Sequence, residues 1–227
     1  MKIFASLIGI TGKMGKEIQK VKTDPSFQII GGVAKKDIKN LKKFLKKSNV
    51  GIDFSNPNAL DELLSIAIKT KTALVLGTTG YSEKDLQKIK DASKKIAIFY
   101  SSNFSVGIAL VQKFANMTSK LLDKSCIDIV EKHHISKKDK PSGTALLLAD
   151  EIKQNLKNDV NIHSIRAANV VFEHTLYFTN EDQTIEIKHT AHDRSIFATG
   201  AIKAAIFIHD KKAGLYSMQD LIGDIYE

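Results

Sequence analysis

Ile3-Phe-Ala-Ser-Leu-Ile-Gly9-Ile-Thr-Gly12-Lys-Met-Gly15 joins a short apolar run directly to three closely spaced glycines. The run predicts a buried strand over Ile3–Ile10, and the amphipathic residues that follow predict a helix over Lys13–Lys22. Glycines at such a junction let the backbone turn tightly and approach a pyrophosphate, which the N–H groups at the helix start would bind. The segment therefore predicts a dinucleotide-binding unit. An ordinary strand–helix turn is the alternative, because the spacing is GxxGxxG rather than GxGxxG.

The first hundred residues continue this alternation of short apolar runs and amphipathic stretches. Helical spacing recurs at Ala59–Lys69 and Ser82–Lys95. Further strands are predicted at Phe27–Ala34, Val50–Phe54, Ala73–Leu76 and Ile96–Tyr100. Strands that alternate with helices indicate βαβ units, so we predict an α/β fold with a Rossmann-like parallel sheet.

The pattern changes after Phe104. Helices are predicted at Val106–Leu122, Ser142–Leu156 and Phe197–Ile208, and strands at Cys126–Lys132, Ile162–Arg166, His174–Thr179 and Thr184–Ala191. Consecutive strands without intervening helices indicate a mixed sheet. We therefore predict two domains: residues 1–104, with residues 210–227 packing back on them, and a smaller α+β domain over residues 105–209.

Composition limits the class of protein. Hydrophobic residues make up 43% of the 227 residues, and Cys126 is the only cysteine, so no internal disulfide can form. We expect a cytoplasmic protein without a membrane span. The formal charge of +9 comes almost entirely from lysine, with Arg166 and Arg194 as the only arginines. A solvated lysine-rich surface explains this charge better than nucleic-acid binding, which favours arginine for base contacts; an anionic cofactor and substrate would also suit it.

Several polar segments follow predicted strands, at the sheet edge where ligands of parallel sheets bind. They are Gly77-Thr-Thr-Gly80 and Ser101-Ser-Asn-Phe104, together with Lys35-Lys36. In NAD-binding proteins, an acidic residue at the position of Lys35-Lys36, after the second strand, would hold the ribose hydroxyls of the cofactor. Two lysines could instead bind a 2′-phosphate, or could simply belong to the basic surface.

The densest polar segment is Glu131-Lys-His133-His134-Ile-Ser-Lys137-Lys-Asp-Lys-Pro-Ser142-Gly-Thr144. Histidine can transfer a proton near neutral pH, lysine can bind a carboxylate, and a helix start at Ser142 would offer N–H groups to an anion. A metal site is the competing interpretation of the paired histidines. Neighbouring residues of an extended segment point to opposite sides, and no further ligand motif is present, so we predict no metal.

These segments together resemble the 4-hydroxy-tetrahydrodipicolinate reductase (dihydrodipicolinate reductase) family. The resemblance rests above all on His133-His134 through Pro141-Ser-Gly-Thr-Ala145. It continues in Asn103-Phe-Ser-Val-Gly107, His189-Thr-Ala191 and Gly214-Leu-Tyr-Ser-Met218. It implies NADPH or NADH as cofactor, a small dicarboxylate substrate of lysine and diaminopimelate biosynthesis, and a homotetramer assembled through the second domain.

The resemblance also implies roles for individual residues. His133 and Lys137 correspond to proton donors. His134, Ser142, Gly143 and Thr144 correspond to the substrate-binding positions. Cofactor contacts are implied at Gly9, Ile10, Thr11, Gly12, Lys13, Met14, Gly77, Thr78, Thr79, Ser101, Ser102, Asn103 and Phe104, and we add Lys35 and Lys36. A different amino-acid or semialdehyde dehydrogenase, or a non-catalytic nucleotide-sensing protein, would not need the segment from His133 to Thr144.

Overall fold

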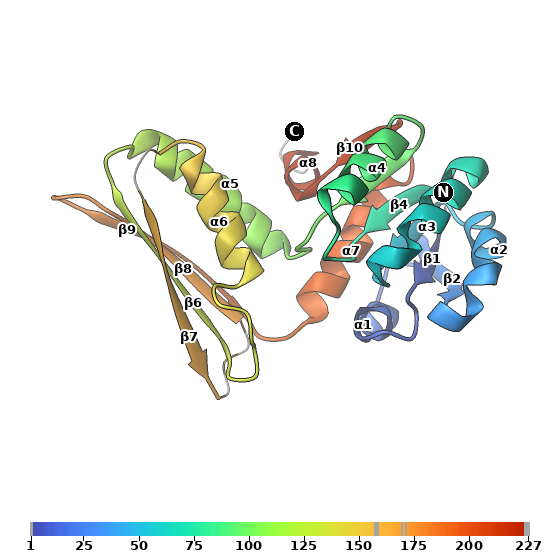
Figure 1. Cartoon of the computed structure of the whole chain (residues 1–227), viewed down its shortest axis with the longest axis horizontal. Helices are drawn as coiled ribbons and strands as arrows, with labels where there is room; N and C mark the ends of the chain where they lie inside the picture. The colour runs from blue at the N-terminus through green and yellow to red at the C-terminus, as the bar shows by residue number, and fades with distance from the viewer. Residues whose placement is uncertain (1, 157–158, 169, 171, 225–227) are drawn as a thin grey trace. The chain divides into compact units, whose positions relative to one another are not determined.

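A computed structural model describes residues 2–156, 159–168, 170 and 172–224, apart from the side chains of residues 36, 38 and 224. The chain forms two compact units (Figure 1). The first comprises the residues up to Phe104 and those from Ser195 onward, and the second comprises Ser105–Arg194.

The first unit is built on a parallel sheet of order β10-β5-β4-β3-β1-β2. Its strands are β1 (Ile3–Ile8), β2 (Phe27–Val33), β3 (Val50–Asp53), β4 (Ala73–Leu76), β5 (Ala97–Tyr100) and β10 (Gly214–Tyr216). The chain passes from β1 to β2 on one side and then returns to β3 on the other. Strand order thus reverses beside β1, which is where open α/β sheets bind ligands.

Helices cover this sheet. They are α1 (Lys13–Lys20), α2 (Leu41–Leu45), α3 (Leu60–Thr70), α4 (Glu83–Ser93), α7 (Ser195–Ile208) and α8 (Met218–Asp224), with 3₁₀ turns at Lys35–Asn40 and Pro57–Ala59. Leucines of α2 and α3 pack with Ile89 of α4 and with Leu74 and Leu76 of β4 in one buried cluster. Helix α2, in the lysine-rich stretch after β2, was not predicted from the sequence pattern. It buries Leu41 and Leu45 and exposes its lysines.

Helix α7 corrects the predicted domain boundary. We assigned Ser195–Ile208 to the second domain, but it packs on α1, β3, β4 and β5 of the first unit. Its buried face consists largely of alanine and glycine, so the helix approaches the sheet closely. A Cβ atom at Gly200 would collide with the carbonyl oxygen of Phe104. The tail beyond residue 210 adds β10 beside β5.

The second unit has a mixed sheet of order β7-β6-β8-β9. Its strands are β6 (Cys126–His134), β7 (Val160–Ala167), β8 (Phe172–Thr179) and β9 (Thr184–Ala191), with β6–β7 parallel and the other pairs antiparallel. Helices α5 (Val106–Leu121) and α6 (Gly143–Lys153) cover one face, where Val111, Leu148, Ile152 and Phe178 help to form its core (Figure 1). The predicted combination of a Rossmann-like sheet and a smaller mixed sheet is confirmed.

Among the described residues, no helix has both the length and the apolar character needed to cross a membrane.

Candidate active site

The glycine loop has the backbone geometry that its sequence predicts. Gly9 has φ +84°, and a Cβ there would lie 2.6 Å from the carbonyl oxygen of Phe54. A Cβ at Gly15 would lie 2.7 Å from the carbonyl oxygen of Ile10, so the first turn of α1 can press against the loop only with glycine at this position. Gly12 is the extended N-cap of α1. Since first-turn N–H groups have no intrahelical partner, the loop and helix start fit a pyrophosphate.

The predicted segments Gly77–Gly80 and Ser101–Phe104 follow β4 and β5. They lie at the same edge of the sheet as the glycine loop, because β1, β3, β4 and β5 are parallel strands of one sheet. The buried carboxylate of Asp53 connects the loops that follow β3 and β4. Its Oδ2 accepts a hydrogen bond from Thr78 Oγ1 at 2.7 Å, its Oδ1 accepts one from Ser55 Oγ at 2.5 Å, and Ser55 N donates to Thr78 Oγ1 at 2.9 Å. Burial raises the pKa of Asp53, although hydroxyl groups of Ser55, Thr78 and Tyr81 act against that rise. The Thr78 side chain thus fixes the loop.

The remaining predicted cofactor residues differ in exposure. Thr11, Lys13, Thr79 and Ser102 are exposed, and Ile10, Met14, Gly77 and Asn103 are half-buried. Ser101 Oγ donates to the carbonyl of Asn103 at 2.6 Å, which makes a tight turn after β5. The Phe104 ring is buried between Phe54 and Phe99, with centroid distances of 5.3 and 5.8 Å. Lys35 is exposed just after β2, whereas the side chain of Lys36 lies outside the described part of the chain.

The second unit contains a pocket of about 450 Å³ where β6 ends. Its lining includes His133, His134, Lys137, Phe172 and Arg194, so several basic side chains converge on it. The size suits a small ligand, and the concentration of positive charge suits an anion. Arg194, one of the two arginines of the chain, has its exposed side chain at this pocket.

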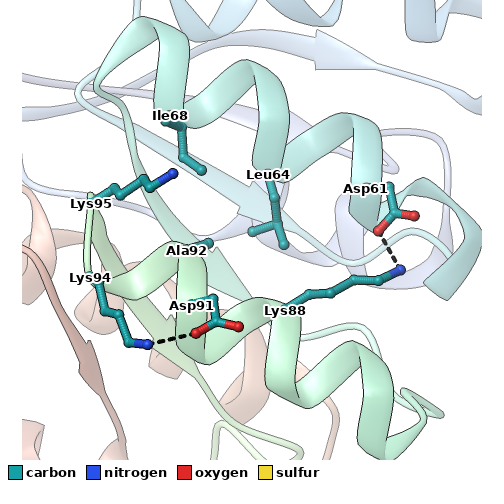
Figure 2. A pocket seen from close by; sticks show the side chains of 8 residues that line it. All are labelled: Asp61, Leu64, Ile68, Lys88, Asp91, Ala92, Lys94 and Lys95. Atoms are coloured by element: carbon teal, nitrogen blue, oxygen red, sulfur yellow. Dashed lines mark hydrogen bonds and ion pairs between the residues drawn. The ribbon is translucent and has the colours of Figure 1, made fainter.

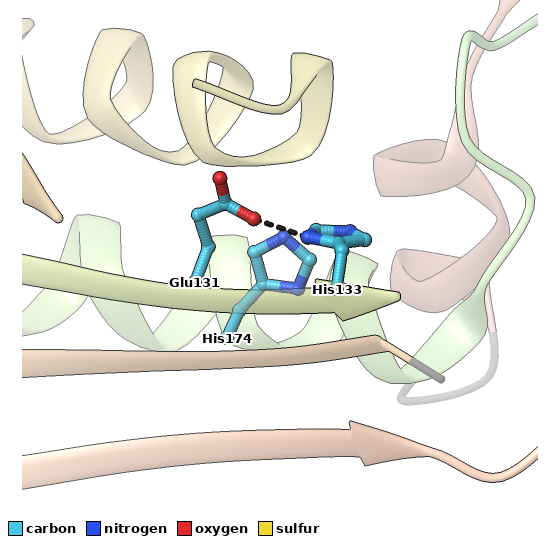
Figure 3. Close-up of side chains that lie close together, drawn as sticks. All are labelled: Glu131, His133 and His174. Carbon is cyan, nitrogen blue, oxygen red and sulfur yellow. Dashed lines mark hydrogen bonds and ion pairs between the residues drawn. The ribbon is translucent and has the colours of Figure 1, made fainter. Parts of the chain in front are cut away.

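His133 is the buried member of the pair and His134 the exposed one, as alternation along a strand requires. Only 3% of His133 is exposed. Its Nδ1 bonds to Oε2 of the wholly buried Glu131, and its ring packs edge-on against His174 at 5.2 Å between centroids (Figure 3). His133 and His134 nevertheless both line the pocket at the end of β6.

Lys137 lies in the turn that follows β6. Its backbone N–H donates to the carbonyl of His134 at 3.0 Å, and its Nζ pairs with Asp139 Oδ2 at 2.8 Å. The Lys137 side chain is 28% exposed, so it can exchange its surface partner for a bound carboxylate.

Ser142, Gly143 and Thr144 begin α6, as predicted. The buried Ser142 is the N-cap: its Oγ accepts from Ala145 N at 3.2 Å and lies 3.2 Å from His174 Nε2. Its hydroxyl is therefore used to build the site. Gly143 is exposed and Thr144 half-exposed at the helix start, where backbone N–H groups favour an anion.

Burial dominates the titration of the two buried histidines. It lowers the pKa of His133, the carboxylate of Glu131 acts in the opposite direction, and Lys137 and Arg166 lower it further. Burial lowers the pKa of His174 to about 4, with a smaller contribution from His133; Glu131 acts against the shift, and His189 and Lys137 add to it. Both rings are therefore neutral near pH 7 in the free protein.

The depressed pKa of His174 predicts a pH-dependent stability. The unfolded chain binds a proton near pH 6.5 and the folded chain only near pH 4, so stability is lost as pH falls through this interval. We expect His174 to account for about 3 kcal/mol of that loss. Urea unfolding of the wild type and of His174→Gln at pH 7, 5.5 and 4.5 measures it. The variant should show a shallower decline than the exposed-site control His192→Gln, and equal slopes would contradict the assignment.

Glu131, His133 and His174 offer three ligand atoms within 4.8 Å of one another, a spacing that a metal ion could use. These groups already have other partners. Glu131 Oε1 lies 2.9 Å from Arg166 Nη1, Oε2 is bonded to His133, and His174 Nε2 faces Ser142. A divalent cation would have to compete with the fixed charge of Arg166 for one carboxylate, so the arrangement favours a hydrogen-bonded network.

Another hollow lies between α3 and α4 of the first unit (Figure 2). Four of its five charged groups pair with one another: Lys88 with Asp61 at 2.6 Å and Lys94 with Asp91 at 2.7 Å. Exposed pairs of this kind add little stability. None of the predicted site residues lines this groove.

Sequence reasoning missed three residues of the site, namely Glu131, Arg166 and His174. The Glu131-x-His133 spacing could have suggested that both side chains share one face of a strand. The other two depend on pairing: Arg166 is in register with His133 across β6–β7, and His174 is in register with Glu131 across β6–β8. No local pattern indicates that register.

A dinucleotide-type glycine loop in one unit and a pocket with basic side chains and a buried histidine in the other are the features of a nicotinamide-dependent oxidoreductase. Comparison with known proteins identifies the family within this class. Family models described as the N-terminus and the C-terminus of dihydrodipicolinate reductase match residues 1–104 and 107–222. The chain belongs to the dihydrodipicolinate reductase family, and the resemblance drawn from its sequence is confirmed.

Individual relatives agree with this assignment. The chain is 38% identical to the 4-hydroxy-tetrahydrodipicolinate reductase of Caldanaerobacter subterraneus subsp. tengcongensis, over 98% of this chain and 99% of the relative. It is 40% identical to the enzyme of that name from Clostridium tetani, over 95% of each chain. Its fold is similar to that of a dipicolinate-bound dihydrodipicolinate reductase from Paenisporosarcina sp. TG-14, with a TM-score of 0.83 and 23% identity over 97% of this chain and 99% of that one.

Proposed function

We propose that this chain is a 4-hydroxy-tetrahydrodipicolinate reductase, which uses NADPH or NADH to produce tetrahydrodipicolinate in lysine and diaminopimelate biosynthesis. The observation that carries the proposal is the pocket of the second unit, where His134, Lys137 and Arg194 surround the edge of the buried His133. A small dicarboxylate suits the ammonium group of Lys137 and the guanidinium group of Arg194, and the family membership agrees with it. Relatives named for this activity match nearly the whole chain.

The residues of the second unit supply binding and protons. Lys137 and His134, with the helix start at Gly143 and Thr144, would hold the substrate carboxylates and withdraw electron density from the ring. When bound, a reduced nicotinamide would supply hydride to the conjugated imine dihydrodipicolinate, which forms when 4-hydroxy-tetrahydrodipicolinate loses its hydroxyl group as water. The carbon that becomes electron-rich must then be protonated, and in this proposal His133 and Lys137, which both line the pocket, deliver the proton.

The first unit would hold the cofactor through its glycine loop. The N–H groups at the start of α1 and the backbone of Gly9–Met14 suit the pyrophosphate, and the loops after β4 and β5 suit the rest of the molecule. In this proposal, the side chains of Thr78 and Phe104 shape those loops, whereas Thr79, Ser102 and Asn103 remain the contact positions.

One assay tests the function directly. The purified chain is incubated with freshly formed 4-hydroxy-tetrahydrodipicolinate and reduced nicotinamide, and loss of the reduced cofactor is followed by absorbance. We expect oxidation that depends on the substrate. Oxidation that is equal with and without the substrate would contradict the proposal. An amino-acid or semialdehyde substrate should give no reaction.

Cofactor choice gives a further prediction. We expect NADPH to be used at least as well as NADH, because Lys35 and Lys36 follow β2 where an acidic residue would repel a 2′-phosphate. Exposed ion pairs are worth under about 1 kcal/mol each, or about fivefold in affinity. Lys35→Ala/Lys36→Ala should therefore shift the ratio of kcat/KM values toward NADH by up to about 25-fold. Lys46→Ala/Lys47→Ala removes the same charge from the residues that follow α2 and should leave the ratio unchanged; an equal shift in both variants would rule out a local role.

The homotetramer and the cytoplasmic location stay predictions of the resemblance. The sheet face of the second unit opposite α5 and α6 exposes residues such as His163 and Ile165, which leaves a surface on which subunits could pack.

A further inference from the structure

Two buried charges beside the pocket have no part in the chemistry proposed above. Glu131 on β6 is completely buried, and the Arg166 side chain on β7 is 6% exposed. We propose that Arg166 and Glu131 form a positioning pair that holds both proton-delivering residues, the side chain of His133 and the backbone of Lys137, in their working arrangement. This inference rests on the proposed function, because it assigns the pair to the same reaction.

Glu131 controls His133. One carboxylate oxygen, Oε2, accepts the bond from His133 Nδ1, and the other, Oε1, forms the ion pair with Arg166 Nη1 at 2.9 Å. Burial alone would raise the pKa of Glu131, but Ser164, Arg166 and His133 together hold it below its ordinary value. The ionised carboxylate therefore keeps a proton on Nδ1 of His133. The opposite nitrogen, Nε2, is left as the atom that can exchange a proton with a bound substrate.

Arg166 controls the loop that carries Lys137. Besides its ion pair with Glu131, its guanidinium donates from Nε to the carbonyl of Lys137 at 3.3 Å and from Nη2 to the carbonyl of Asp139 at 2.5 Å. Asp139 in turn pairs with the Lys137 side chain. One cation thus joins the strand that carries His133 to the turn that carries Lys137.

This task requires arginine. Its planar group presents donors in several directions from one rigid centre, whereas a lysine ammonium is a single point on a flexible stem. Strand pairing places the group correctly, because Arg166 is in register with His133 across the parallel β6–β7 pair. Burial also strengthens the interaction, since few water molecules compete for these charges.

Kinetics of Glu131→Gln and Arg166→Lys test the proposal. For Glu131→Gln we expect kcat to fall about 10²-fold, with a change of less than about threefold in substrate KM, because a positioning residue costs at most what the group it positions contributes. Arg166→Lys should lower kcat and also raise KM, since it loosens Lys137. Glu173→Gln is the matched control. Glu173 lies on β8 and pairs with Lys132 of β6 and Lys188 of β9, and its loss should leave both constants unchanged.

A double-mutant cycle separates positioning from a general structural effect. If Glu131 acts through His133, adding Glu131→Gln to His133→Gln should lower kcat by less than about threefold more. Independent losses that multiply would overturn the proposal. So would wild-type kinetics in Glu131→Gln and Arg166→Lys.

A spectroscopic readout covers variants that fold poorly and does not depend on turnover. In protein with ¹⁵N-labelled histidine, NMR should show His133 with its proton on Nδ1 in the wild type and a mixture of tautomers in Glu131→Gln. The double variant Glu131→Gln/Arg166→Met removes both buried charges, so that neither charge is left without its partner. We expect this variant to fold and to show the same mixture of His133 tautomers. A single unchanged tautomer in both variants would refute the role of Glu131. A wild-type protein without reductase activity would instead contradict the proposed function. The NMR measurement would still test whether Glu131 sets the tautomer of His133.

Discussion

His133→Gln is expected to lower kcat by about 10²- to 10⁴-fold, the range that a general acid contributes, while substrate KM changes by less than about threefold. A proton donor acts in the transition state, so its loss affects turnover more than binding. Glutamine can still donate a hydrogen bond to the buried Glu131, which keeps that carboxylate paired and the fold intact. Steady-state kinetics on the folded variant provide the measurement.

The pH dependence of the wild type supports this assignment in a second way. Because a donor must be protonated, the rate should fall as pH rises through the pKa of His133. Burial holds that pKa below its ordinary value in the free protein, whereas two bound carboxylates would raise it. The apparent pKa of kcat, which reports the substrate complex, should therefore exceed that of kcat/KM.

His209→Gln is the control for both measurements. This histidine follows α7 in the first unit, where its Nδ1 lies 2.7 Å from the carbonyl oxygen of Ile206. Its replacement should change neither the rate nor the pH profile. Wild-type turnover in His133→Gln, or an unaltered pH profile, would exclude His133 as the donor.

Lys137→Ala is expected to reduce kcat/KM by about 10³-fold or more, divided between the two constants. A hydrogen bond to a charged group is worth about 1.5–3 kcal/mol, so losing the contact with a substrate carboxylate should raise KM about 10- to 100-fold. The remainder should come from kcat, because the ammonium group also assists protonation.

Two further variants divide these roles. Lys137→Arg keeps the positive charge but provides a group that does not release its proton, so KM should recover largely while kcat stays low. Lys138→Ala removes the exposed neighbouring lysine and should leave both constants near wild type. An unchanged KM in Lys137→Ala would show that Lys137 does not contact the substrate.

Local sequence patterns were sufficient for most of the first unit. Alternation of apolar runs and amphipathic segments predicts β1 to β5 with small errors at their ends, because burial of one helix face or of a whole strand leaves a direct periodic trace. The glycines at positions 9, 12 and 15 likewise predict the turn, since a side chain at Gly9 or Gly15 would collide with the backbone. Short helix α2 was missed because its two buried leucines are surrounded by lysines.

The candidate site divides in the same way. The sequence by itself determined the family resemblance, the strand–turn–helix order from His133 to Thr144, and the opposite orientation of the two histidines, since all of these depend on neighbouring residues. Only the tertiary structure showed that α7 belongs to the first unit, because a helix with apolar residues on every side does not reveal which surface it covers. Only the tertiary structure joined Glu131 to Arg166 and placed His174 beside His133. Those contacts depend on strand register between segments more than thirty residues apart, which hydrophobic periodicity does not encode.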